Sequence, residues 1–173
     1  MTDPVLVFDI ETTGLEIDSK IHCLCIHDSR SNEIASYNDT GNSPSITTGV
    51  TALDDSCWLV GHNIIGFDLL VLQHHFPFLN GHGRTLDTAL LSRLRYPDLM
   101  ERDAKSTLVP KHLWGRHSLE AWGYRLKDLK GDYNNPNTDW STWTQDLEDY
   151  CKQDVKLTRR LYTHFQKVFP GLP

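Results

Sequence analysis

The segment VLVFDIETTGL, residues 5–15, opens with an apolar run and then places Asp9 and Glu11 with one residue between them. Side chains alternate between the two faces of a strand, so a strand here points both carboxylates to one side and Phe8 and Ile10 to the other. Two like charges on one face repel each other unless a cation lies near them. The segment therefore predicts a buried strand that carries two ligands of a cation site.

Length and composition set the frame for this strand. The chain has 173 residues, 39% of them hydrophobic, and this predicts one domain over residues 1–173 with a sizeable core. The sequence contains no apolar window of about 18 residues, and its start lacks a basic region followed by an apolar one. We therefore expect no contact with a membrane and a cytoplasmic location.

The four cysteines, Cys23, Cys25, Cys57 and Cys151, form no CxxC pair and are too sparse for a disulfide scaffold. We expect reduced thiols, most of them buried. The alternating segment HCLCIHD, residues 22–28, offers Cys23 and Cys25 as zinc ligands, but a buried strand explains the alternation better.

Charge is unevenly distributed along the chain, whose net charge is −6. Residues 1–60 carry ten acidic residues against Lys20 and Arg30, whereas residues 101–130 carry seven basic residues against four acidic ones. Acids that gather cations and a local basic segment suit a substrate with a phosphate backbone. A solvated surface of mixed charge explains the basic segment equally well.

The order of apolar patterns predicts an α/β domain with a mixed sheet. Strands over residues 21–28 and 33–37 follow the first strand as an antiparallel meander, and a short helix follows over 46–56. A strand over 57–62 is then expected to run into a helix over 63–76, and a strand end and helix follow over 85–96. Beyond a weakly patterned connection over 97–111, we expect a helix over 118–126 and a turn-rich stretch over 131–139. A long last helix is expected from Thr142, because Thr142 and Gln145 have the spacing of a capping box.

Two more acids lie where a solvated charge is uncommon. Asp68 falls where the buried strand opens into a helix, and Asp154 lies in an apolar stripe of the last helix, with Tyr150 one turn earlier on the same face. Four converging carboxylates form a hard oxygen site that suits Mg²⁺ or Mn²⁺ better than zinc. Each motif alone is a weak signal, and their convergence is the hypothesis that the structure must test.

Taken together, FDIETTGL, HNIIGFD and YCKQD resemble the three motifs of the DEDD exonuclease superfamily, in its tyrosine-containing (DEDDy) subgroup. The resemblance runs from about Val5 to Phe169. A further segment, GRHSLEAWGYRLKDLKGDY from Gly115 to Tyr133, is similar to part of the 3′→5′ proofreading domain of phage family A DNA polymerases of the T-odd type.

The resemblance implies a ribonuclease H-like fold with a mixed five-stranded sheet flanked by helices, and removal of nucleoside 5′-monophosphates from a DNA 3′ end with two divalent ions, Mg²⁺ or Mn²⁺. It implies that Asp9 bridges both ions, that Glu11 and Asp154 hold the ion that activates water, and that Asp68 serves the second ion. It also implies that Tyr150 orients the attacking water by a hydrogen bond, because a phenol with an ordinary pKa near 10 is a poor base at neutral pH.

Other roles follow from the same resemblance. Thr12 and Leu15 lie where the family contacts the terminal nucleotide, and Asn63 and Phe67 either touch the substrate or serve as helix cap and core. Asp87 resembles a recurring acid of related domains, although a cap on its own helix explains it as well. We expect His62 to be structural. The substrate is expected to be a single-stranded or frayed DNA 3′ end.

In the phage polymerases a long polymerase module follows this domain, whereas this sequence stops at Pro173. Two explanations are open: the chain is a free-standing exonuclease, or it is a fragment of a longer polymerase. A free-standing exonuclease could act with a separate DNA polymerase subunit, in the cytoplasm of a phage host. Two rival functions are a DEDDy exoribonuclease, which shares the metal chemistry, and a non-catalytic module that docks a polymerase.

Overall fold

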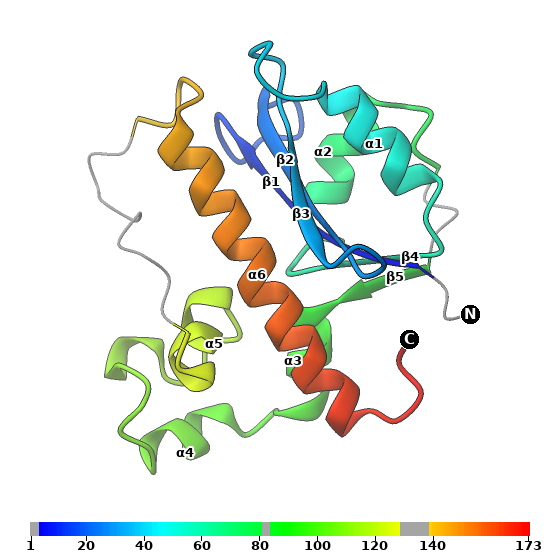
Figure 1. Cartoon of the computed structure of the whole chain (residues 1–173). Helices are drawn as coiled ribbons and strands as arrows, with labels where there is room; N and C mark the ends of the chain where they lie inside the picture. The colour runs from blue at the N-terminus through cyan, green and yellow to red at the C-terminus, as the bar shows by residue number, and fades with distance from the viewer. Residues whose placement is uncertain (1–3, 81–83, 129–138) are drawn as a thin grey trace.

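A mixed five-stranded sheet with helices on both sides forms the centre of the computed structural model (Figure 1). The structure describes residues 4–80, 84–128 and 139–173. Its strands are β1 (Val5–Thr12), β2 (Ile21–Asp28), β3 (Glu33–Tyr37), β4 (Trp58–Gly61) and β5 (Arg84–Asp87). They lie in the order β3-β2-β1-β4-β5, with the first three antiparallel and β4 and β5 added parallel to β1. The expected mixed sheet is confirmed, and the strand with the two acids is its centre.

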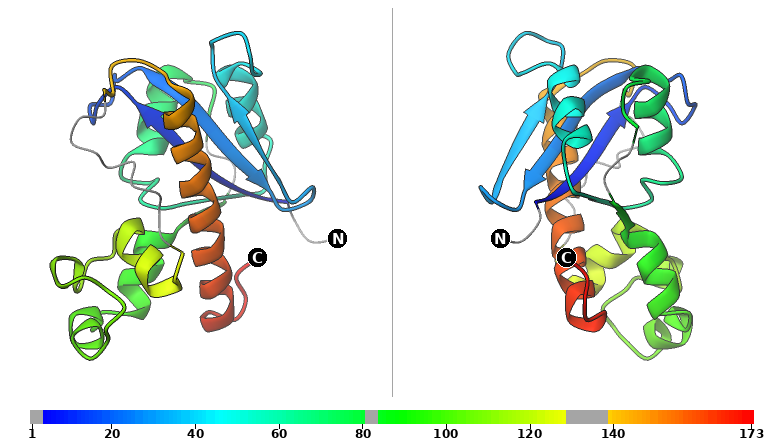
Figure 2. Two further views of the ribbon diagram at one scale, coloured as in Figure 1. Left: turned by 60° about the vertical axis from the view of Figure 1, so that its left-hand side comes forward. Right: turned by 90° about the vertical axis from the view of Figure 1, so that its right-hand side faces the viewer.

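Each face of the sheet has its own helical cover, as the two turned views show (Figure 2). Helices α1 (Ile46–Asp54) and α2 (Asp68–His75) pack on the face that carries Phe8 and Ile10, whereas α6 (Gln145–Val168) crosses the face that carries Val7. The period-2 alternation of β1 thus separates two cores. The acids share the α6 side with Val7, because they are odd-numbered residues of the same strand.

The remaining helices lie beyond the β4–β5 side of the sheet, around the C-terminal half of α6 (Figures 1 and 2). They are α3 (Thr88–Arg95), α4 (Leu99–Ala104), the 3₁₀ turn η1 (Lys111–Leu113) and α5 (Leu119–Leu126). Leu157, Leu161 and Phe165 of α6 bury themselves against Trp122 of α5 and Leu99. This cluster fixes the axis of α6 relative to the sheet, and with it the positions of the acid and phenol that α6 carries.

Two expected helix starts are wrong, and one expected connection contains a helix. Helix α2 begins at Asp68 and not near residue 63, because Asn63 has a φ of 66°, which is left-handed and not helical. Helix α6 begins after Thr144, whose hydroxyl accepts from the amide of Leu147 at 3.1 Å, so Thr144 and not Thr142 is its cap. The connection over 97–111 contains α4 and the start of η1. The turn-rich stretch over 131–138 and the segment similar to phage polymerases beyond Asp128 fall outside the described residues.

The cysteines and part of the basic segment can now be placed. All four cysteines are free; Cys57 is exposed and the other three are buried, as expected.

Arg125, one of the basic residues of segment 101–130, forms a buried ion pair, with its Nη2 2.7 Å from Asp103 Oδ2. Its charge therefore stabilises the fold and is not available to a phosphate backbone. Within the described ranges, no helix is long and apolar enough to cross a membrane.

Candidate active site

The two acids of β1 lie near its C-terminal end, on the side of the sheet that α6 covers. Asp9 is half-buried and Glu11 is buried. In the antiparallel register with β2, Asp9 lies opposite Cys25 and Glu11 lies opposite Cys23. The thiol of Cys151 on α6 donates toward the carbonyl oxygen of Asp9 at 3.4 Å and toward its Oδ2 at 3.7 Å. The first strand therefore presents two carboxylates, side by side, beneath the last long helix.

Asp68 reaches the same place from the opposite side of the sheet. It is the first residue of α2, and its Oδ1 accepts from the amide of Ile10, between the two β1 acids, at 3.2 Å. Burial raises the pKa of Asp68 to about 7; the Ile10 amide opposes this shift, and the nearby charges of Asp87 and Asp154 add to it. A carboxylate in this setting gains from a bound cation, since a cation favours the ionised form.

The turn that precedes Asp68 is held by Asp87, at the end of β5. Its carboxylate accepts from the amides of Asn63 at 2.8 Å and Ile65 at 3.2 Å, and from Ala89 of α3 at 2.9 Å. Asp87 does cap its own helix, as the sequence suggested, but it also fixes the backbone of residues 63–65. This second role explains why the chain turns there before α2 begins.

His62 precedes this turn and lies at the site. Its Nδ1 is 2.9 Å from the hydroxyl of Thr88, which itself donates to the carbonyl of Gly61 at 3.0 Å. The hydroxyl has one proton, so the Nδ1 of His62 must be the donor in this pair. The imidazole is thereby fixed in one tautomer and one orientation by β4 and α3.

The last helix supplies the remaining predicted groups. Asp154 is buried and Tyr150, one turn earlier, is half-buried. The ring of Trp140 meets the ring of Tyr150 edge to face, with centroids 6.4 Å apart and planes at 79°. The carbonyl of Trp140 lies 2.9 Å from Nε2 of His22 on β2, so this residue is tied to the sheet as well as to α6.

These elements enclose one pocket with a volume of about 450 Å³. All nine residues to which the sequence assigned a role line this pocket: Asp9, Glu11, Thr12, Leu15, Asn63, Phe67, Asp68, Tyr150 and Asp154. The pocket is also lined by Trp140 and His62. Sequence reasoning missed Trp140, because it lies in an unpatterned stretch where no spacing marks it, and it assigned His62 to the fold alone.

The donor set of the pocket fits hard divalent cations. The four acids offer carboxylate oxygens, the ligands that Mg²⁺ and Mn²⁺ prefer. Ligand atoms of Asp9 and Glu11 lie within 4.8 Å of each other and of the Cys151 sulfur. Asp9 and Asp154, which are 145 positions apart in the sequence, thus line the same pocket.

Comparison with known sequences gives one close set of relatives. No family model matches the chain. The DNA-directed DNA polymerase of Enterobacteria phage T3 is 30% identical over 181 aligned residues, which cover 91% of this chain and 26% of the polymerase. The chain therefore spans about a quarter of the length of the curated relatives it matches.

Solved structures share its fold. NrnC of Brucella melitensis bound to pGG aligns with a TM-score of 0.63 at 20% identity, over 94% of this chain and 72% of that one. Exonuclease I of E. coli in complex with an oligonucleotide aligns with a TM-score of 0.66 at 13% identity, over 98% of this chain and 42% of that one. These two likenesses confirm the ribonuclease H-like fold. The chain therefore shares the fold of exonuclease I and NrnC and is similar in sequence, over 91% of its length, to part of a phage DNA polymerase.

Proposed function

We propose that the protein is a metal-dependent 3′→5′ exonuclease that removes nucleoside 5′-monophosphates from the 3′ ends of DNA. The observation that carries this proposal is the meeting of four carboxylates and one phenol, from β1, α2 and α6, around a single pocket. The relation to a phage DNA polymerase supports DNA as the substrate.

The four acids would hold two Mg²⁺ or Mn²⁺ ions. Asp9 is proposed to serve both ions, Glu11 and Asp154 the first ion, and Asp68 the second. When bound, such a pair of ions supplies an activated water and stabilises the leaving 3′ oxygen. The raised pKa of Asp68 supports a cation here, because a buried acid with acidic neighbours is otherwise costly to ionise.

Tyr150 is proposed to position the attacking water by a hydrogen bond from or to its phenol oxygen. A phenol keeps its proton at neutral pH, so its contribution is orientation and not proton removal. The edge-to-face contact with Trp140 limits rotation of the Tyr150 ring, which makes that orientation reproducible.

The terminal nucleotide is proposed to lie against Thr12, Leu15, Asn63 and Phe67, which line the pocket beside the acids. The Leu15 side chain is 87% exposed, so it stabilises no core and is available to pack against a base. The bond from Asp87 to the Asn63 amide sets the position of this wall of the pocket.

A second candidate substrate is RNA. The solved relative NrnC is described bound to pGG, so this fold also accommodates a short guanine dinucleotide in a relative. Contacts to a 2′-hydroxyl are local and are not encoded in the metal ligands. A separate polymerase partner is also proposed, because a chain with a net charge of −6 has weak general attraction for a phosphate backbone.

The test uses the purified chain with matched 5′-labelled DNA and RNA oligonucleotides in Mg²⁺, Mn²⁺ or EDTA. We expect a metal-dependent ladder that shortens from the 3′ end of DNA. Asp9→Ala and Asp154→Asn should abolish it while circular dichroism shows an intact fold. Asp149→Asn, an exposed acid on the same helix, is the matched control and should cleave like the wild type.

Three other results separate the alternatives. Faster digestion of RNA would make the protein an exoribonuclease. Cleavage that persists in Asp9→Ala would contradict the metal site itself. A folded wild type that cleaves neither substrate, alone or with a polymerase of its own source, would favour a docking module, and a tight DNA complex of the isolated chain at physiological salt would count against the need for a partner.

A further inference from the structure

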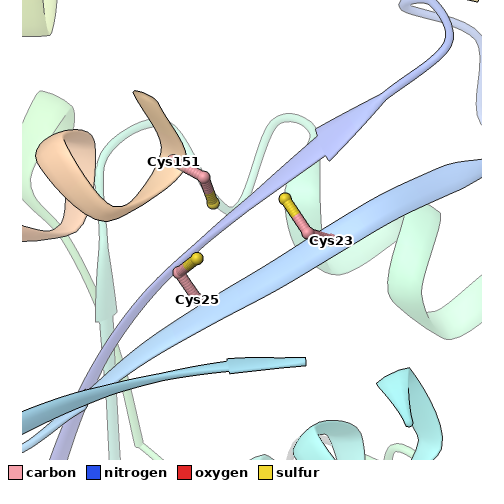
Figure 3. Close-up of side chains that lie close together, drawn as sticks. All are labelled: Cys23, Cys25 and Cys151. Carbon is pink, nitrogen blue, oxygen red and sulfur yellow. The ribbon is translucent and has the colours of Figure 1, made fainter. Parts of the chain in front are cut away.

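Three buried thiols meet directly beside the carboxylates of the proposed active site. Cys23 and Cys25 come from β2 and Cys151 comes from α6, and Figure 3 shows their side chains converging between the strand and the helix. The three sulfur atoms all lie within 4.8 Å of one another, and each residue is fully buried. The sequence offered only the Cys23 and Cys25 pair, and the fold adds the third thiol from 126 residues further along the chain.

The strand register places this cluster next to the two β1 acids. Cys25 is the direct partner of Asp9 and Cys23 is the direct partner of Glu11. Directly paired residues of antiparallel strands point to the same face of the sheet, with their Cβ atoms about 5 Å apart. Two carboxylates and two thiols therefore form one patch beneath α6, and Cys151 is close to both halves of it.

Cys151 links the two halves. Its sulfur lies in the group formed with Cys23 and Cys25 and also in the group formed with Asp9 and Glu11. The Cys151 thiol donates toward the carbonyl oxygen of Asp9 at 3.4 Å and toward its Oδ2 at 3.7 Å. A cation held by the three sulfurs would take the place of the donated proton.

The chemistry of the two halves differs. Carboxylate oxygens select Mg²⁺ and Mn²⁺, whereas sets of thiolates select soft ions such as Zn²⁺ and Cd²⁺. Zinc accepts three cysteines and a carboxylate oxygen as a tetrahedral set, with each coordinating thiol releasing its proton to solvent. Core packing alone explains buried cysteines, but it gives no reason for three of their sulfur atoms to lie within 4.8 Å of one another beside two acids.

We propose that Cys23, Cys25 and Cys151 form a binding site for one thiophilic divalent cation, Zn²⁺ or Cd²⁺, with a carboxylate oxygen of Asp9 or Glu11 as the fourth ligand. The proposed route of the cation runs through the pocket that Asp9 and Glu11 line and past these carboxylates to the thiols behind them. Because it engages a carboxylate that the hard cations need, its binding inhibits hydrolysis. The binding site stands on the cysteines alone, and the inhibition rests on the proposed exonuclease function.

The first experiment titrates Cd²⁺ into the full chain, kept reduced and free of Mg²⁺, and records the ultraviolet charge-transfer absorption of cadmium–thiolate bonds. We expect one Cd²⁺ per chain in the wild type and in Cys57→Ser, which removes the exposed thiol outside the cluster. Cys23→Ala and Cys25→Ala should each weaken binding at least tenfold and lower the absorption by about a third, one of three sulfur ligands.

If a buried cysteine variant does not fold, the wild type alone still tests the proposal. The ¹¹³Cd resonance of the wild type alone reports the number of sulfur ligands, and three sulfurs are expected. Absence of thiolate absorption in the folded wild type, absorption that disappears in Cys57→Ser, or equal binding by wild type and Cys25→Ala would each overturn the site and leave the cysteines as core residues.

The second experiment measures Mg²⁺-dependent hydrolysis of a labelled DNA 3′ end after incubation with one equivalent of Cd²⁺. We expect at least a tenfold loss of rate in the wild type and in Cys57→Ser, and little loss in Cys25→Ala. Equal inhibition of all three proteins would mean that Cd²⁺ acts on the carboxylates directly and would overturn the coupling. If the chain hydrolyses no DNA at all, the proposed function fails, while the cadmium titration still decides the thiol site.

Discussion

Asp68 and Asp87 show how two buried carboxylates of similar burial do different work. Asp68 accepts from the amide of Ile10 and has a pKa that burial raises to about 7, whereas Asp87 accepts from three amides and fixes a turn. Chain position alone distinguishes them poorly, since both stand next to the start of a helix. The number and direction of the amides that donate to each carboxylate decide which of the two carboxylates is available to a cation.

The pKa of Asp68 predicts how stability depends on pH without metal. A folded pKa near 7 lies above the ordinary value of 3.8, so the folded state binds this proton more tightly than the unfolded state. Its stabilising contribution is complete below about pH 4 and is lost as pH rises through 7, with a slope of up to about 1.4 kcal/mol per pH unit. Urea unfolding in EDTA from pH 4 to 8 should show this loss, and Asp68→Asn should remove it. An identical pH profile for both proteins would contradict the assigned burial.

Removal of the Asp87 carboxylate should damage the site more than the fold. Asp87→Ala leaves the amides of Asn63 and Ile65 without their acceptor, at a cost of about 1–3 kcal/mol. A shift of about 1 Å in a substrate-positioning group costs on the order of 100-fold in rate. If the turn over residues 63–65 moves by this amount, kcat should fall by about that factor, measured at a temperature where the variant is folded.

The conservative change gives the matching control. In Asp87→Asn the amide oxygen can still serve Asn63 and Ala89, and only the bond to Ile65 is lost, so an intermediate rate is expected. Asp98→Asn, at a helix start without a side-chain cap, should leave the rate unchanged. Equal rates for Asp87→Ala and the wild type would show that the turn needs no support from β5.

At the scale of elements, close packing and capping decide where each helix lies. Helix α1 approaches the sheet through Gly49, where a Cβ would lie 2.7 Å from Cγ of Tyr37 and 2.8 Å from Cδ2 of Leu24. Helix α6 is fixed at its start by Thr144 and in its C-terminal half by the aromatic cluster around Trp122 and Phe165. Of these two helices, α6 carries active-site groups and α1 carries none, so mutations in them should have different outcomes.

Gly49→Ala tests the close approach of α1. Alanine favours a helix over glycine by about 1 kcal/mol, but the clash with β2 and β3 should cost about 1–3 kcal/mol and give a net loss of stability. Denaturant unfolding measures this, with Thr47→Ala on the exposed side of α1 as control. The rate per folded molecule should not change, and a lower rate at full folding would show that α1 influences the pocket.

Comparison of sequence and structure at this scale shows what local patterns can specify. Alternation located the strands, and the stripe of α6 located Tyr150 and Asp154, because these patterns reflect burial on one face. The starts of α2 and α6 were misplaced, because a carboxylate from β5 holds residues 63–65 and a nearer threonine caps α6. Helix α4 was missed since its six residues are held by tertiary contacts, among them the bonds from Arg125 and Gly115 to Asp103.

The whole molecule explains why the site itself could be predicted only as a hypothesis. Its acids were recognisable from their motifs, but their convergence depends on α2 and α6 packing on opposite faces of the same strand. Trp140 and the cluster of three thiols could not be predicted, since each requires segments more than a hundred residues apart to meet. Register and packing, and not local pattern, bring them together.

Cation binding should stabilise the whole fold. Four acids gathered in one pocket repel one another, and an ion bound to the folded state alone adds about 2.7 kcal/mol at 100 times its Kd. We expect Mg²⁺ and Mn²⁺ to raise the Tm of the wild type and of Asp149→Asn, and to leave that of Asp9→Ala unchanged. A Tm increase of the same size in all three would assign the effect to general screening of charge.

The sheet order β3-β2-β1-β4-β5 also means that the strands around the pocket differ in their free energy of local unfolding. The strand with Asp9 and Glu11 pairs with β2 along its length and with β4 at residues 5–7, whereas β5, which carries Asp87, has β4 as its one neighbour among the described residues. Edge strands fray at a lower free energy than central ones, so amide hydrogens of β5 should exchange with solvent before those of β1. On warming, the turn over residues 63–65, which Asp87 holds and which is proposed to contact a nucleotide, would then lose its support while the acids of β1 remain in place. Substrate binding would weaken before the cation ligands separate.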